Sequence, residues 1–151
     1  MGNVSSVRKS FKYGFVLNEQ ELRRIYDIMT TQMKEIDPGE NYQKTFDITY
    51  KNSVSEKKTT IEDIFNEDNG QKWEIEKIEI EFDSSYKNRI NILFDSKNAS
   101  YHISINIKGE NRNWVYLTLS KLEERISFIK RFALLTNPWT MLSPIVKTKI
   151  D

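Results

Sequence analysis

Three polar side chains on one short segment are the place where this sequence could carry out chemistry. His102, Ser104 and Asn106 alternate with three isoleucines. Alternate residues of a strand share a face, so we expect these three side chains to line one polar strip. A Ser–His–acid relay would need further groups from elsewhere, and the sequence contains no Gly-x-Ser-x-Gly pattern. We therefore expect an inert, exposed histidine, with ligand binding by the strip as the alternative.

An acidic run is the second candidate site. Two Glu-x-Glu pairs could bind a hard cation if they faced a cleft. Lys72 and Lys77 interrupt the run, however, and apolar residues alternate with the glutamates. That pattern is typical of the solvated face of a sheet, with Lys87 and Arg89 as expected cross-strand partners. The run consists of Glu74, Glu76, Glu79 and Glu81.

Composition argues against several classes of function. The chain has no cysteine and one histidine, which removes disulfides, thiolate nucleophiles and multi-histidine metal sites. Five glycines and no phosphate-loop motif argue against familiar nucleotide chemistry. A formal net charge of +1 with interspersed signs gives no reason to expect a nucleic-acid partner. We expect no cofactor, no bound metal and no enzymatic activity.

The N-terminus fits a loose acylation pattern. Gly2 with Ser6 matches the N-myristoylation motif, and Arg8, Lys9 and Lys12 follow. An acyl chain beside basic residues is a two-signal membrane anchor. The pattern is short, so a peripheral membrane protein anchored through Gly2 is a weaker alternative. Otherwise the lack of a long apolar run predicts a cytoplasmic protein.

The segment after Asn137 is too rich in apolar residues to be expected as a chain end without any role in packing or binding. Its large apolar side chains could pack on the sheet or form an interaction surface for a partner or a second copy. They include Trp139, Met141, Leu142 and Ile145.

These candidate residues need a scaffold, which begins with a strand, a helix and a second strand. Alternation of aromatic residues predicts a strand over residues 11–17. Asn18 and Glu21 form a capping-box pattern that opens a helix over residues 18–36. Period-two alternation returns at residues 44–50. A polar loop over residues 51–58 and a short helix, opened by Thr59 and Glu62, are expected next.

Four strand-like segments follow in quick succession. They begin at Trp73, Arg89, Tyr101 and Trp114. The first changes phase near Lys77, which predicts a β-bulge there. Their connections are too short for parallel crossovers, so neighbouring strands should pair as antiparallel hairpins. A second long helix is expected over residues 120–135, opened by a capping-box pattern at Ser120 and Glu123.

The predicted fold is therefore α+β. It is an antiparallel β-meander of about four to six strands with two amphipathic helices and one short helix, in the order β-α-β-α-β-β-β-β-α. We expect a flexible segment over residues 1–9, one domain over 10–136, and an apolar tail over 137–151. The two long helices should cover one face of the sheet.

The expected function is a non-enzymatic protein-interaction or regulatory module that binds a protein partner or self-associates. The alternative is a small-molecule-binding cup that uses the polar face carrying His102.

Overall fold

The computed structural model describes residues 3–12, 14–66, 74–85, 87–98, 100–135 and 146–147. The strands are β1 (Ser5–Phe11), β2 (Val16–Leu17), β3 (Gln43–Tyr50), β4 (Ser55–Lys58), β5 (Ile75–Ser84), β6 (Asn88–Asp95), β7 (Ile103–Gly109) and β8 (Val146–Lys147). The helices are α1 (Glu19–Ile36), α2 (Ile61–Phe65) and α3 (Arg112–Leu135).

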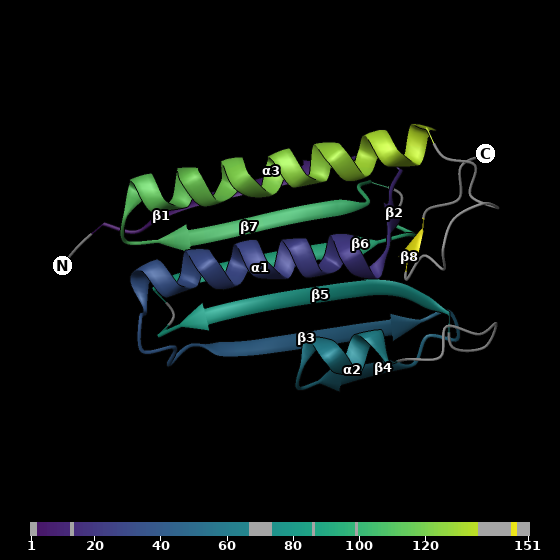
Figure 1. Ribbon diagram of the computed structural model, residues 1–151, viewed down its shortest axis with the longest axis horizontal. Helices are drawn as coiled ribbons and strands as arrows, with labels where there is room; N and C mark the ends of the chain where they lie inside the picture. Colours follow the sequence, from purple (N-terminus) through teal and green to yellow (C-terminus); the bar gives the residue numbers. More distant parts are fainter. Residues whose placement is uncertain are drawn as a thin grey trace.

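Six strands form one antiparallel sheet in the order β1-β7-β6-β5-β3-β4. Strands β2 and β8 pair separately. Helices α1 and α3 run along the same face of the large sheet, and the short α2 lies beside β4 (Figure 1). The predicted α+β class, the antiparallel sheet and the placement of two long helices on one face are confirmed.

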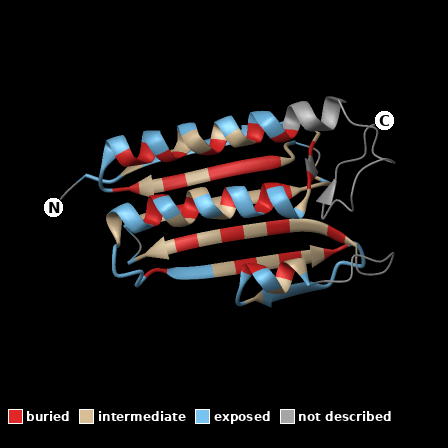
Figure 2. Ribbon diagram, viewed as in Figure 1, coloured by how far each residue is buried: buried red, intermediate tan, exposed pale blue. Residues whose placement is uncertain are grey.

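The core lies between the two long helices and the sheet. Along β3, β5 and β6 buried residues alternate with half-buried ones over most of the strand, β7 is buried over most of its length, and α1 and α3 turn their buried side chains toward the strands (Figure 2). Burying one such side chain stabilises the fold by about 2 kcal/mol relative to exposure. The sheet contributes to this core Phe46, Ile48, Tyr50, Ile78, Ile80, Phe82, Ile90, Ile92, Phe94, Ile103, Ile105 and Ile107.

Local sequence patterns correctly predicted two features of the fold. The Asn18 side chain accepts a hydrogen bond of 2.8 Å from the backbone N–H of Glu21 and so caps α1 as predicted. The β-bulge predicted near Lys77 is also present. Thr49 pairs with Lys77, whereas Tyr50 pairs with Ile75, which leaves Glu76 as the extra residue of β5.

The segment from Trp114 to Leu119 is not a strand, as its apolar character had suggested, but part of α3. Helix α3 begins at Arg112, where the Asn111 side chain accepts a hydrogen bond of 3.2 Å from the N–H of Trp114. A short apolar run does not by itself distinguish a buried strand from a buried helix. Ser120 therefore lies inside the helix and is not its N-cap.

Four further features differ from the sequence-based prediction. Residues 5–9, expected in a flexible segment, belong to β1, and the expected strand over 11–17 is divided between β1 and β2. Residues 55–58, expected in a loop, form β4. The capping box of α2 is made by Thr60 and Asp63, one residue later than predicted.

Candidate functional site

The face of the large sheet that points away from α1 and α3 is polar. We call it the open face; it comprises the strand residues that alternate with the core residues. One of its rows crosses the four central strands through Thr45, Glu81, Asn91 and Asn106, which are register partners in that order. Among the residues that the structure describes, no helix covers this face.

Charge is divided unevenly over the open face. Strands β4, β3 and β5 carry four carboxylates against two lysines, a formal charge of −2. Strands β6, β7 and β1 carry three basic residues against one carboxylate, a formal charge of +2. We call these two groups the acidic half, with Asp47, Lys57, Lys77, Glu79, Glu81 and Asp83, and the basic half, with Arg8, Arg89, Asp95 and Lys108.

Like charges oppose each other at the centre of the acidic half. Asp47 and Glu79 are direct register partners, and neither forms an ion pair or hydrogen bond with any other described side chain. Burial is the largest cause that raises the pKa of Glu79. Lys77 opposes this rise, and the charges of Asp47 and Glu81 add to it. Lys57 is the register partner of Asp47 on β4, so the repulsion within this pair is offset in part, and the remainder costs free energy in the isolated domain.

Arg89 neutralises part of the acidic half, as predicted. Its Nε lies 3.7 Å from a Glu81 oxygen and 3.9 Å from an Asp83 oxygen. Asn91 donates a hydrogen bond of 3.4 Å to Glu81 as well. Lys87 is the other expected partner, but its Nζ instead lies 3.9 Å from Oε1 of Glu110.

Of the predicted polar strip, Ser104 and Asn106 lie on the open face. Ser104 is buried between Ser10 and Leu93, its register partners on the two neighbouring strands. Asn106 lies between Arg8 and Asn91 and is half-buried.

The ring of His102, the residue directly before β7, takes part in a local contact. Its Nδ1 lies 3.1 Å from the carbonyl oxygen of Asp95, so this nitrogen carries the proton and donates. The ring also packs edge-on against the buried Phe15, with 6.5 Å between centroids. These contacts account for the histidine as a structural residue.

Acidic residues of the run at 74–81 do not gather into a metal site. Across the described ranges, no three His, Asp or Glu side chains lie close enough together to hold an ion. Glu74 pairs with Lys51 at 3.5 Å, and Glu76 pairs with Lys97 at 2.6 Å.

A polar seam between α1 and α3, on the other side of the sheet, was missed by sequence reasoning. Gln32 is fully buried and donates a hydrogen bond of 2.8 Å to the buried Thr118 hydroxyl. Lys121 donates to the Gln32 side chain at 3.1 Å, and the Trp114 ring donates to the Gln32 carbonyl at 2.7 Å. The one signal was Gln32 itself, a polar residue beside the apolar stripe of its helix.

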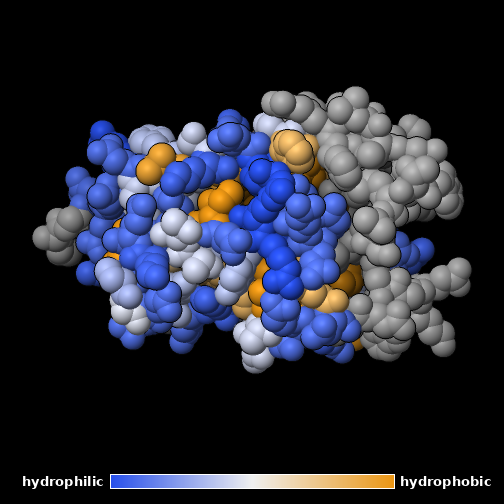
Figure 3. Space-filling model, in the orientation of Figure 1, coloured by the Kyte–Doolittle hydropathy of each residue, from blue (hydrophilic) through white to orange (hydrophobic). Residues whose placement is uncertain are grey.

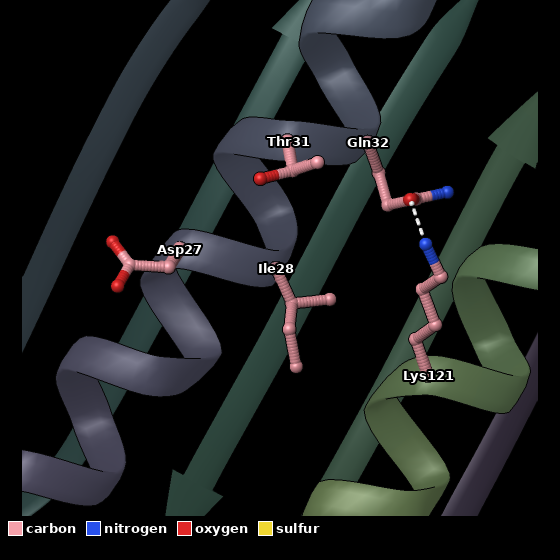
Figure 4. Close-up of a pocket in the computed structure, with 5 residues that line it drawn as sticks. All are labelled: Asp27, Ile28, Thr31, Gln32 and Lys121. Carbon is pink, nitrogen blue, oxygen red and sulfur yellow. Dashed lines mark hydrogen bonds between the residues drawn. The ribbon is translucent and has the colours of Figure 1, made fainter.

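A shallow hollow of about 180 Å³ lies above this seam. Asp27, Ile28 and Thr31 of α1 border it on one side, and the hydrogen bond between Lys121 and Gln32 closes the other (Figure 4). Of its polar groups, Gln32 and Lys121 bond to each other, and the hollow lies on the opposite side of the sheet from Ser104 and Asn106.

Apolar side chains on the helix-bearing face are scattered. Figure 3 shows small hydrophobic patches separated by hydrophilic surface. Helix α3 exposes Tyr116 by 59%, Leu117 by 47% and Phe128 by 46%. Phe128 lies about 16 Å along the helix from Leu117 at the usual rise per residue, and the Arg125 guanidinium stacks on its ring at 4.5 Å.

The remaining predicted sites lie outside the described residues. These are the acylation candidate Gly2 and the apolar tail residues Trp139, Met141, Leu142 and Ile145. Within the described chain, no helix has the length and apolar character needed to cross a bilayer.

Comparison of this chain with protein-family models, curated proteins and solved structures gives no significant match. Its function is therefore inferred from the geometry of the fold alone.

Proposed function

We propose that this chain is a non-enzymatic protein-interaction module and that the open face is its binding surface. The observation that carries the proposal is the row in which Asp47 stands opposite Glu79. Two carboxylates placed directly opposite each other weaken a sheet. A positively charged partner would relieve this repulsion, so the arrangement is better explained by binding than by folding.

The remaining features of the face agree with a binding role. Antiparallel sheets commonly pack one face on the core and leave the other in water, where a second protein can reach it. In the row that crosses the four central strands, Thr45, Asn91 and Asn106 are shorter than the fourth member, Glu81, and allow a partner to approach closely at their positions. Separated charge of both signs favours specific orientation and fast encounter over high affinity.

The alternative of a small-molecule cup has less support. It requires His102 to converge with Ser104 and Asn106 on a cavity. The His102 ring instead donates to the Asp95 carbonyl, and the helices lie on the other side of the sheet.

Site-specific photo-crosslinking in the native host tests the proposal. A photoreactive amino acid replaces Asn91 on the open face in one variant and Ser120, exposed on α3, in the other. We expect a discrete protein adduct from position 91 that disappears when Glu79→Lys is added. Adducts from position 120 alone, or adducts from position 91 that are indifferent to Glu79→Lys, would place the binding surface elsewhere.

A further inference from the structure

We infer that the partner of the open face is a second copy of this chain, packed face to face across a two-fold axis parallel to the strands. This inference rests on the proposed function and adds to it the identity and orientation of the partner. It starts from the opposite formal charges of the two halves, −2 and +2.

Symmetry decides which orientation the charges allow. Most homodimers have a two-fold axis, and two copies that meet through the same face need that axis to lie in the interface. An axis parallel to the strands exchanges the halves, so each acidic half meets the basic half of the other copy. An axis perpendicular to the strands places each half on itself and opposes like charges. Complementary charge therefore selects the parallel axis.

The middle of the sheet lies between β5 and β6. A parallel axis at this position places β3 of one copy over β7 of the other. Thr45 then faces Asn106 of the other copy, and Glu81 faces Asn91, since all four belong to one row. In the neighbouring row Asp47 faces Ser104, whose small buried side chain leaves room for approach, and Glu79 faces Leu93. Opposite charges meet in the rows on either side, where Asp83 faces Arg89 and Lys77 faces Asp95 of the other copy.

The edges of the sheet do not favour the other common route to a dimer. β4 has four residues, Ser55–Lys58, all of them polar. In β1, Lys9 points to the helix side and pairs with Glu123 at 3.2 Å. Short charged edges and inward-pointing charges block pairing between sheet edges. Of the two ways in which the sheets of two copies could meet, edge to edge or face to face, the second is therefore favoured.

Thiol crosslinking tests the orientation directly because the chain contains no cysteine. Two single variants, Thr45→Cys and Asn106→Cys, are treated with a short bismaleimide, which spans the roughly 10 Å between packed sheets. In the proposed dimer two copies of residue 45 are offset by about three strand spacings, or roughly 14 Å, whereas residues 45 and 106 face each other. Ser120→Cys on α3 gives the background from random collisions, and urea unfolding confirms that each variant folds.

We expect the equimolar mixture to give roughly ten-fold more crosslinked dimer than either variant alone, since the facing thiols have a high effective concentration. Equal crosslinking within and between the variants, or yields at the Ser120→Cys background, would overturn the inference. If the photo-crosslinked partner from position 91 is another protein and the mixture stays at background, the proposed function stands and the second copy is ruled out. If neither experiment gives a product, both proposals fail.

Discussion

Asp47 of β3 and Glu79 of β5 stand directly opposite each other on the open face, and no other described side chain pairs with either of them. Asp47 has Lys57 as its other register partner, on β4, whereas Glu79 has the uncharged Leu93 on β6, so the repulsion between the two carboxylates is only partly offset and costs free energy. The pair lies at the centre of the acidic half, and its effect on the free energy of unfolding can be measured in the isolated domain.

Replacing Glu79 with Gln should stabilise the protein at pH 7 by about 0.5 kcal/mol, the scale of one cross-strand charge pair. The folded state raises the pKa of Glu79 above its ordinary value of 4.5, so the folded state holds its proton more tightly than the unfolded state. The contribution of Glu79 to wild-type stability therefore falls as the pH rises from 4.5 through the raised pKa. The gain from Glu79→Gln should be complete at pH 7 and absent below about pH 4.

Urea unfolding at both pH values, at protein concentrations where the chain is monomeric, measures this difference. Glu124→Gln, at an exposed position of α3, is the matched control. Equal effects of the two substitutions, or a loss of stability in Glu79→Gln at pH 7, would show that the acidic row is not strained.

A second prediction concerns the contribution of the polar seam between α1 and α3 to the free energy of unfolding. Gln32→Leu keeps most of the side-chain volume but removes the amide that bonds to Thr118 and Lys121. The Thr118 hydroxyl is then buried without its partner, which should cost about 2 kcal/mol in the free energy of unfolding. Gln20→Leu, on the exposed side of α1, should change that free energy by less than about 0.5 kcal/mol. Similar losses in both variants would contradict a specific role for the seam.

A buried ion pair joins the same helices nearer the start of α1. Arg125 donates hydrogen bonds of 2.9 and 3.0 Å to the two oxygens of Glu21, which is 5% exposed. Arg125→Met should cost about 2 kcal/mol, because Glu21 keeps only the more exposed Arg24 as a partner. Adding Glu21→Leu should recover most of the loss, since no buried charge is then left unpaired. A double variant as unstable as the sum of the single variants would show that the two residues are not coupled.

Gly109 supports the start of α3. A Cβ atom at this position would lie 2.8 Å from the Trp114 ring and 3.0 Å from Val115. Gly109→Ala should therefore displace the helix start and cost about 2 kcal/mol. Gly39→Ala is the matched control, because its Cβ would meet the flexible amide of Asn41 instead. Thermal unfolding of both variants compares them, and a control as destabilised as Gly109→Ala would show that the tight contact is unimportant.

Sequence patterns correctly predicted those features of the fold that depend on residues close together in the chain. Asn18 marks the start of α1 because capping involves residues three apart. The phase change near Lys77 marks the bulge because side-chain alternation along one strand reveals it. The short turns after β5 and β6 predict antiparallel neighbours for the same reason.

Features that depend on distant residues were not predictable in this way. Trp114 becomes helical where Gly109 and Gln32 accommodate its ring, and neither is part of its local apolar pattern. Strand β4 has a polar sequence because it lies at the edge of the sheet. Gln32 and Thr118 are 86 residues apart, so the sequence around either residue does not predict their hydrogen bond. The charge division of the open face likewise appears only when the strand order is known.

Sedimentation velocity of the 151-residue chain tests the central claim that the open face binds a second copy of the chain. We expect reversible dimerisation that weakens roughly ten-fold between about 0.05 and about 0.5 M NaCl, because salt screens the charges at the interface. The double variant Glu79→Lys with Glu81→Lys should be monomeric, whereas Leu117→Ser on α3 should associate like the wild type. A chain that is monomeric at every concentration and salt level, or a dimer unaffected by reversing Glu79 and Glu81, would contradict self-association through the open face.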